Sequence, residues 1–238
     1  MSPPSARRDA LRARLLAEAP AWYSPWVHLA FPSLFGVAVV ALCVRSLGGV
    51  RPLELLVVPL VLLVSNAIEW HVHRGLLHRR TAPLGMLYER HTPQHHLVFV
   101  TEDMAMRSWK EFRLVLIPFY GIVAVVALDA PVAALLWLCG LPHAAALFLS
   151  TSTAYVIGYE WLHLCYHFPA HTRIGRSRLL ARLRHHHAVH HAPELMQKWN
   201  FNVTVPLWDW LRGTIHPGDR DERGEHDPRA AARRGILR

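Results

Sequence analysis

Ten of the 18 histidines fall into four clusters whose spacing suits metal binding. The clusters are His73-x4-His78, His91-x3-His95-His96, His163-x3-His167 and His187-x2-His190-His191. Neutral imidazole is the commonest protein ligand of transition metals, and one ion takes about four to six ligands. Ten imidazoles are therefore too many for one ion and suit two. Because the clusters lie at the ends of apolar segments, this pattern indicates oxygen-dependent chemistry on a lipid.

Helical spacing favours a shared ligand face in most of these clusters. Residues three or four apart lie on one face of a helix, and the second, third and fourth clusters each contain such a pair. His73 and His78 are five apart, which suits a regular helix poorly. Gly75 lies between them and allows the helix to end or to bulge at this point.

Other metal chemistries fit the histidine clusters less well. A structural zinc site usually takes four ligands, often cysteines, but Cys43, Cys139 and Cys165 all lie inside apolar stretches. A metal transporter needs ligands near the middle of its spans, but the clustered histidines lie at span ends, and only His28 and His143 occur elsewhere in or beside the spans. A membrane zinc hydrolase typically carries an HExxH motif, which the sequence lacks. A metal-handling membrane protein and a zinc hydrolase remain the alternatives.

The apolar residues are concentrated in long segments. The sequence is 52% hydrophobic with a mean hydropathy of +0.16, and about 20 apolar residues suffice for one helical span. Spans are predicted at about 27–47, 53–70, 114–128 and 143–164. The last two fall within residues 114–172, which contain no Lys or Arg. Residues 130–142, broken by Pro131, Gly140 and Pro142, are expected to form a short hairpin or to lie at the far surface.

These segments predict an all-α integral membrane protein with one domain at residues 27–215. All four histidine clusters would lie on the same side of these four spans. Residues 1–26 read as a basic lead-in, amphipathic or irregular, and residues 216–238 as a charged, mobile tail. The first 25 residues lack the apolar core of a cleavable signal peptide, so the first span is expected to remain as an anchor.

The distribution of positive charge predicts the orientation. The chain has 26 Lys and Arg against 17 Asp and Glu, and only Arg45 and Arg51 lie on one side of the predicted spans. By the positive-inside rule, both termini and all four histidine clusters are cytoplasmic. The sequence shows no zinc-finger spacing, RNP-like motif or basic heptads, so we assign the charge to an anionic membrane surface and not to nucleic acid. Lysine occurs only at positions 110 and 198 in an Arg- and Ala-rich chain, which indicates a GC-rich bacterium and its inner membrane.

Acidic residues near the clusters are candidates for orienting the ligands. Glu69 precedes His73 by four residues, Glu160 precedes His163 by three, and Asp209 follows the last cluster. A carboxylate that accepts a hydrogen bond from the second ring nitrogen orients a metal-bound histidine. A carboxylate as close to the membrane as Glu160 has a functional role by default. For Asp209, a helix cap or a salt bridge is an equal alternative.

Two longer stretches resemble a known family. Residues 69–78 (EWHVHRGLLH) resemble its E-[YW]-x-x-H-R-x-x-[LF]-H box, and residues 200–214 (NFNVTVPLWDWLRGT) resemble its N-x-G-V-T-x-P-L-W-D-x-x-x-G-T signature. The third and fourth clusters resemble its later boxes. The chain is thereby similar, over roughly residues 55–215, to the fatty acid hydroxylase superfamily, which includes sterol desaturases, C4-sterol methyl oxidases and sphingolipid hydroxylases.

This chain departs from the family pattern at two places. The family's second box is usually HxxHH, whereas this chain has one more residue there and carries Pro93 inside it, which disfavours a regular helix. Asn202 stands where glycine is common, and asparagine tolerates similar backbone angles.

The resemblance implies a four-span helical membrane domain with a cytosolic cap that binds two non-haem irons. The ten clustered histidines would be the ligands, supported by Glu69, Glu160, Asn202 and Asp209. The family uses dioxygen and two electrons from a separate donor protein, of the ferredoxin or cytochrome type, to hydroxylate or desaturate a lipid. Sterols, fatty acyl chains, sphingolipids and isoprenoids are all open as substrates. Zinc binds imidazole tightly enough to replace iron in purified samples.

Overall fold

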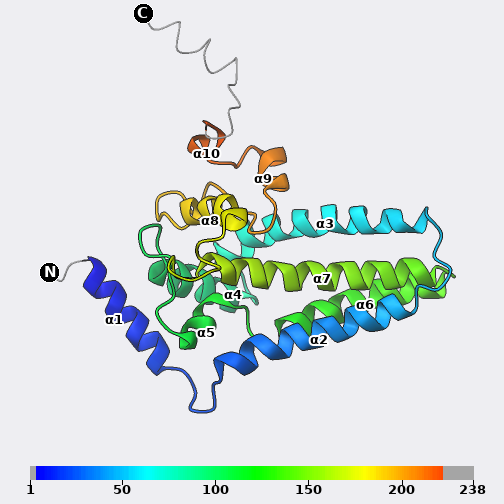
Figure 1. Ribbon diagram of the computed structural model, residues 1–238, viewed down its shortest axis with the longest axis horizontal. Coiled ribbons are helices and arrows are strands. Elements are labelled where there is room, and N and C mark those ends of the chain that lie inside the picture. The colour runs from blue at the N-terminus through cyan, green and yellow to red at the C-terminus, as the bar shows by residue number, and fades with distance from the viewer. Residues whose placement is uncertain (1–3, 222–238) are drawn as a thin grey trace, which may run out of the picture.

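The computed structural model of this chain describes residues 4–221. Within that range the chain is helical, and the pairing outside helices amounts to one isolated bridge between Val100 and Asp103. Long helices lie side by side in a bundle, and the shorter ones gather at one end of it as a cap (Figure 1). The predicted all-α class is confirmed.

The bundle consists of four long helices: α2 (Pro25–Arg45), α3 (Val57–Val72), α6 (Gly121–Leu138) and α7 (Pro142–Tyr166). The cap contains the shorter α-helices: α1 (Pro4–Ala17), α4 (Gly85–Arg90), α5 (Phe112–Val115), α8 (Arg178–His190), α9 (Leu207–Arg212) and α10 (Pro217–Asp221). Two π-helices, η2 (His73–Leu77) and η3 (His91–His96), follow α3 and α4. Two 3₁₀ turns, η1 (Glu54–Leu56) and η4 (Trp109–Glu111), precede α3 and α5.

Helix α7 is the central element of the bundle and packs against α2, α3 and α6 (Figure 1). Its 25 residues span about 37 Å, and it buries polar side chains such as Ser150 and Thr153 among its neighbours. Gly36 allows α2 to approach α7 closely, since a Cβ atom there would lie 2.5 Å from Cδ1 of Ile157. The long helix that ends in the third histidine cluster is thereby held on three sides.

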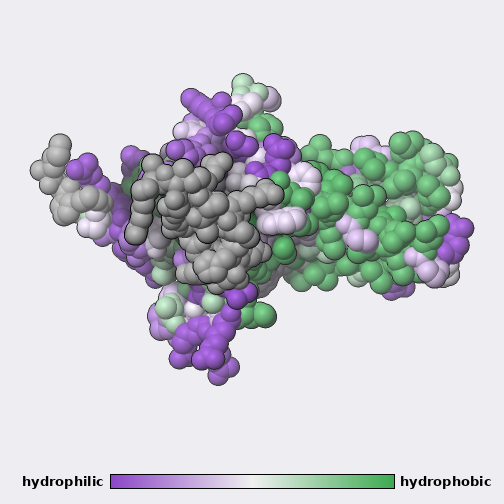
Figure 2. Space-filling view, turned by 90° about the horizontal axis from the view of Figure 1, so that it is seen from above, coloured by the Kyte–Doolittle hydropathy of each residue, from purple (hydrophilic) through white to green (hydrophobic). Residues whose placement is uncertain are grey.

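Three helical segments are long and apolar enough to cross a membrane: Pro25–Arg45, Glu54–Leu77 and Gly121–Leu138. They turn large apolar side chains outward, and apolar residues dominate the surface of the bundle while hydrophilic residues dominate the cap (Figure 2). These features indicate an integral membrane protein. Helix α7 falls outside this group because its polar residues, which face the other helices, lower its hydropathy.

The third long helix begins later than the span predicted at about 114–128. Helix α5 ends at Val115, Leu116 is extended, and Pro118 interrupts the chain before α6 begins at Gly121. The residue before a proline is disfavoured in a helix, and proline itself lacks the N–H that a helix interior requires. The predicted start of this span was therefore wrong.

Of the two alternatives for residues 130–142, a short hairpin or a position at the far surface, the structure contradicts the hairpin. Helix α6 continues through Pro131 to Leu138, as helices of membrane type tolerate an internal proline. The chain turns only at Gly140, whose φ of 76° favours glycine. Gly140 therefore lies at the end of one long helix, and Pro131 does not divide this helix into two short segments.

The basic N-terminal lead-in is a helix docked on the cap. Arg12 of α1 is buried, donates from Nη1 to Oε2 of Glu111 at 2.7 Å, and donates from Nη2 to the Val98 carbonyl at 3.3 Å. Leu15 joins the same apolar core as Phe112. Helix α1 is therefore part of the folded domain, whose start was predicted only at residue 27.

The predicted mobile tail begins as ordered structure. Helix α10 covers Pro217–Asp221, and the buried Asp219 accepts a hydrogen bond from Nδ2 of Asn200 at 2.7 Å. The remainder of that predicted segment, residues 222–238, lies outside the described residues.

Candidate metal centre

Two π-helices shape the first two histidine clusters. A π turn holds one more residue than an α turn and so brings side chains five positions apart onto the same side. In η2 and the residue after it, the rings of His73 and His78 stack with centroids 5.2 Å apart. In η3, the Nε2 atoms of His91 and His96 lie 3.0 Å apart. The bulge that Gly75 allowed is confirmed, and the longer second box forms the same kind of turn.

The ten clustered histidines meet at the cap end of the bundle, in two groups of five. The first group is His73, His78, His91, His96 and His190, and the second is His95, His163, His167, His187 and His191. In each group the candidate ligand atoms lie within 4.8 Å of one another, and all ten residues are buried. The structure therefore brings together every histidine that the sequence singled out.

The two groups share their supporting helices. Helix η3 places His95 in the second group and its other two histidines in the first. Helix α8 places His190 in the first group, whereas His187 and the following His191 belong to the second. The groups are adjacent, since the rings of His96 and His191 stack with centroids 4.2 Å apart. The second and fourth clusters thus bridge two sites, while the first and third each serve one.

Main-chain carbonyls fix the tautomers of five rings. The Nδ1 atoms donate as follows: His73 to Phe201, His95 to Leu114 at 2.8 Å, His167 to Met104 at 2.8 Å, His190 to Trp199 at 2.8 Å and His191 to Phe99 at 2.6 Å. A carbonyl oxygen can only accept, so each of these Nδ1 atoms carries the proton. Each Nε2 atom therefore presents a lone pair, which is the form that binds a metal.

His78 and His190 show why a cation fits between the rings. The Thr92 hydroxyl donates to the Leu77 carbonyl at 2.8 Å and so accepts from Nδ1 of His78 at 3.2 Å. Both His78 and His190 then carry a lone pair on Nε2, and these two nitrogens lie 3.0 Å apart. Two acceptors at this distance repel each other, and a cation held by both turns the repulsion into attraction.

Further ring nitrogens lack protein partners. Nδ1 of His96, Nε2 of His167 and Nδ1 of His187 are buried without a hydrogen-bond partner among the described residues. Buried polar atoms are normally satisfied, so such exceptions indicate a binding site. Neither group includes an Asp, Glu or Cys within residues 4–221. An all-imidazole set suits iron, zinc, copper or nickel and does not suit calcium or magnesium.

Burial keeps these histidines neutral. It lowers the pKa of His78 to about 2 and that of His190 to about 4, with the charge of His190 as the second cause for His78. Burial also holds the pKa of His191 well below its ordinary value. Because imidazole binds metal only when it is unprotonated, the cap presents ligands that are ready at neutral pH.

Glu69 contacts no histidine ligand, contrary to the prediction that it orients His73. Its Oε1 atom accepts hydrogen bonds from the N–H groups of Val203 and Thr204, and its Oε2 atom accepts from the hydroxyls of Thr204 and Tyr155. The carboxylate instead fixes the segment whose Phe201 carbonyl holds His73. Main-chain N–H groups and hydroxyls, and not the ring of His73, provide the hydrogen bonds that the Glu69 carboxylate accepts.

Glu160 does not orient His163 either. Both of its carboxylate oxygens accept from the N–H of Ile117, at 3.2 and 3.3 Å. This N–H lies in the break between α5 and α6, where no helix partner is available. Glu160 therefore satisfies the backbone that the proline-containing break exposes.

Asn202 and Asp209 form a reciprocal pair that shapes the C-terminal loop. The Asp209 carboxylate accepts from the N–H groups of Phe201 at 3.0 Å and Asn202 at 2.7 Å, and Oδ1 of Asn202 accepts from the Asp209 N–H at 3.0 Å. The residue of this loop with a positive φ is Asn200, with a value of 60°, and not Asn202. These residues support the loop that carries the Phe201 carbonyl and touch no ligand directly.

His186 and His187 are neighbours with different roles. Nε2 of His186 lies 3.2 Å from Oδ2 of Asp209, and its Nδ1 atom lies 3.4 Å from Oδ2 of Asp219. Burial alone would lower the pKa of His186, but the hydrogen bonds and charges of these two carboxylates outweigh it and raise the pKa. His186 is thus paired with acid, whereas the next residue along the helix faces the second histidine group.

A cavity of about 60 Å³ adjoins the histidines. Three rings from the two groups form part of its wall: His91, His95 and His163. The rest of the wall is almost entirely apolar and comes from η2, α4, α5, the break before α6, and α7: Leu77, Leu87, Arg90, Leu114, Val115, Leu116, Ile117, Pro118 and Tyr159. The cavity suits a hydrocarbon segment placed directly beside the candidate metal ligands.

The comparison with protein families agrees with this geometry. The family model described as fatty acid hydroxylase matches residues 58–214, from within α3 to the end of the C-terminal signature. No curated protein and no solved structure matches the chain. The matched region holds all ten clustered histidines and covers more than half of the sequence. The chain belongs to the fatty acid hydroxylase family.

Proposed function

We propose that this protein is a membrane-bound, O2-dependent di-iron oxidoreductase that hydroxylates or desaturates a C–H bond of a lipid. One observation carries the proposal: two adjacent groups of five buried, neutral imidazoles lie at the end of an apolar bundle. Membership of the fatty acid hydroxylase family implies an oxidoreductase and supports this assignment.

Each histidine group would hold one iron. The donor set fits, because the candidate ligand nitrogens of each group converge and five of the ten rings are held through Nδ1 by main-chain carbonyls. Iron bound there supplies, with dioxygen and two electrons, the oxidising power for lipid C–H cleavage. The ten histidines act as ligands, and no separate acid or base is assigned.

The apolar wall of the cavity positions the substrate chain and excludes water. Leu114, Leu116 and Tyr159 shape a space in which an alkyl segment lies beside His95 and His163. Apolar walls exclude water, which protects an oxidising centre from side reactions. The small volume holds the substrate chain close to the ligands and restricts which carbon is exposed to them.

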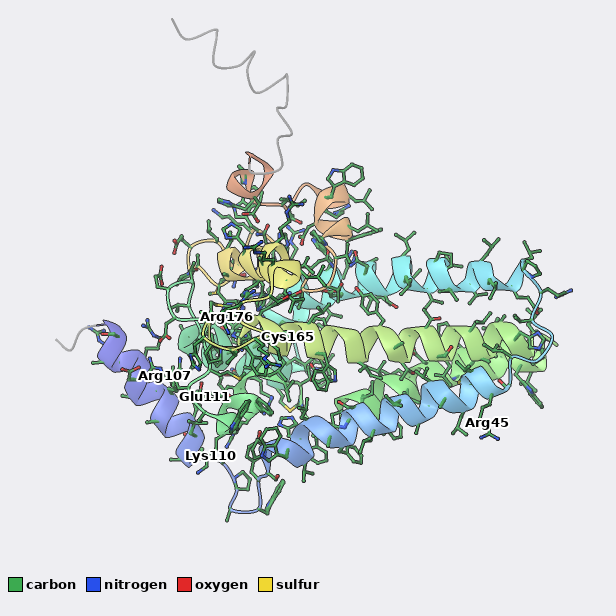
Figure 3. The ribbon with its side chains drawn as sticks, in the orientation of Figure 1. Arg45, Arg107, Lys110, Glu111, Cys165 and Arg176 are labelled. Carbon is green, nitrogen blue, oxygen red and sulfur yellow. The ribbon has the colours of Figure 1, made fainter. Side chains whose placement is uncertain are left out.

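We also propose that all four long helices cross the membrane and that the cap is cytosolic. Helix α7 lies alongside three membrane-type helices and matches them in length. Arg107, Lys110 and Arg176 lie at the cap end, whereas Arg45 lies at the opposite end (Figure 3). The positive-inside rule then favours a cytosolic cap, and the composition favours a bacterial inner membrane. A separate ferredoxin or cytochrome, acidic on its docking face, would reduce the irons from that side.

The test is untargeted lipid mass spectrometry on cells that do or do not express the protein, supplied with iron, oxygen and a compatible electron donor. We expect one lipid class to gain an oxygen atom or to lose two hydrogens. His163→Ala and His187→Ala should abolish this change, while the exposed His185→Ala serves as the matched control. Absence of any lipid change, or full activity in either ligand variant, would overturn the proposal in favour of metal handling.

A further inference from the structure

Two arginines lie beside the cavity that adjoins the histidines. Arg90 ends α4, immediately before His91, and lines the cavity. Arg113 lies in α5, immediately before Leu114 of the cavity wall. The two are in contact, since Nη2 of Arg90 donates to the Arg113 carbonyl at 2.9 Å. Arg90 therefore lines, and Arg113 adjoins, a cavity whose wall otherwise consists of three histidine rings and mostly apolar side chains.

These arginines carry charge that no acidic residue neutralises. Within the described part of the chain, neither forms an ion pair, and Nη1 of Arg113 is buried without a hydrogen-bond partner. Both oxygens of the nearby Glu160 accept from the Ile117 N–H, and no ion pair joins them to either arginine. Both side chains are half-buried, and a half-buried cation without an acidic partner favours the binding of an anion.

The pair lies where lipid head groups would be expected. Helix α5, which carries Arg113, packs against α2, and Nε2 of His28 in α2 lies 2.8 Å from the carbonyl of Ile117 in the cavity wall. Trp26 is 54% exposed and lies 5.1 Å from the ring of Trp109, which is 50% exposed. Exposed tryptophans of this kind mark the interface between a bilayer and water. The apolar cavity and the arginines thus meet at the boundary between the bundle and the cap.

We propose that Arg90 and Arg113 bind the anionic head group, a carboxylate or a phosphate, of the lipid substrate, and that the segment of the alkyl chain next to this head group occupies the cavity beside His91, His95 and His163. This inference deepens the proposed function and rests on it, because the bound lipid is a substrate only through the proposed oxidation. Guanidinium groups suit such anions because they donate several hydrogen bonds in a planar fork. Since Arg90 directly precedes a ligand, the oxidised carbon lies near the head group and not at the far end of the chain.

The experiment measures binding, independently of turnover. The purified, metal-loaded protein in zwitterionic nanodiscs is titrated with palmitate, hexadecyl phosphate, hexadecan-1-ol and inorganic phosphate, with tryptophan fluorescence as readout. The variants are Arg90→Lys, Arg113→Gln and, as matched control, Arg79→Gln, an exposed arginine outside the cavity wall. Metal content and melting temperature are recorded for each variant, so that a folding defect is recognised.

We expect the two anionic amphiphiles to bind roughly tenfold more tightly than hexadecan-1-ol, and Arg113→Gln to remove this preference. Arg90→Lys should weaken it, and Arg79→Gln should keep it. Equal affinity for palmitate and hexadecan-1-ol in the wild type would overturn the head-group site, as would an unchanged preference in a folded Arg113→Gln variant. Inorganic phosphate binding as tightly as hexadecyl phosphate would overturn the lipid assignment. A failure of the proposed oxidation would instead show as absent metal or absent lipid products.

Discussion

The Thr204 hydroxyl donates to Oε2 of Glu69 at 2.6 Å, and the Thr204 N–H donates to Oε1 at 3.1 Å, although the two residues are 135 positions apart. Glu69 ends the apolar part of α3 and Thr204 lies in the C-terminal signature. Phe201 precedes Thr204 in the same loop, and its carbonyl accepts a hydrogen bond from Nδ1 of His73. The carboxylate therefore positions a ligand through a loop and not by touching it.

Replacing Glu69 should loosen this loop. In Glu69→Gln, one of the two oxygens becomes an amide nitrogen, which cannot accept from the N–H groups or the hydroxyls that face the carboxylate. We expect a loss of about 1–3 kcal/mol in unfolding free energy, measured by thermal denaturation in detergent. Glu89→Gln, in an exposed ion pair with Arg80, is the control and should change little. An unchanged melting temperature in Glu69→Gln would contradict the role of the loop.

The division of histidines into two groups predicts stepwise metal loss. His78→Ala removes a ligand from the first group alone, and His163→Ala removes one from the second alone. Each variant leaves four imidazoles in its group and should weaken the binding of that one ion, so that dialysis against a chelator leaves about one ion per chain in each single variant and almost none in the double variant. Inductively coupled plasma mass spectrometry measures this, with His185→Ala as the unchanged control. Two retained ions in either single variant would refute the grouping.

His186 should matter for stability and not for metal content. In His186→Gln the buried carboxylates of Asp209 and Asp219 lose their cationic partner, which should cost about 3 kcal/mol. His185→Gln is the matched control, since the side chain of His185 is 50% exposed. The expected result is a lower melting temperature for His186→Gln at unchanged metal stoichiometry. Loss of one ion would instead identify His186 as a ligand.

The docking of α1 depends on one buried ion pair. Arg12→Ala leaves Glu111 buried without its cation, and we expect a cost of about 3 kcal/mol together with release of α1. Limited proteolysis should then cleave the chain before α2 faster than in the wild type. Arg14→Ala, whose exposed side chain pairs with Glu18, should digest like the wild type. Equal digestion of the Arg12 variant would contradict the anchoring role.

The sequence was sufficient to predict which histidines come together, because their residue type and their spacing identify them as metal ligands. It could not predict how His95 and His190 are divided between the two groups, since that depends on how η3 and α8 face each other. Nor could it identify the groups that hold the rings. Five of these are main-chain carbonyls, such as those of Leu114 and Met104, which every residue carries and no pattern reveals.

The predicted contacts of the acidic residues with the histidines were wrong for a related reason. Glu69 and Glu160 lie at helical spacing from ligands, so a direct contact was a reasonable expectation. Sequence spacing does not show that unpaired N–H groups at Thr204 and Ile117 lie closer to them. The third long helix was misplaced because hydrophobicity is continuous through Pro118 and Pro131, and only tertiary packing decides which proline breaks the helix.

The π turns of η2 and η3 also bear on how such chains tolerate change. One residue inserted into a regular α-helix would rotate everything after it by about 100° and would turn the later ligands away. A π turn absorbs the added residue within one wide loop, so His96 still faces His91. The number of residues between histidines in this box is therefore free to drift by one during evolution, and a motif written with fixed gaps will overlook functional members.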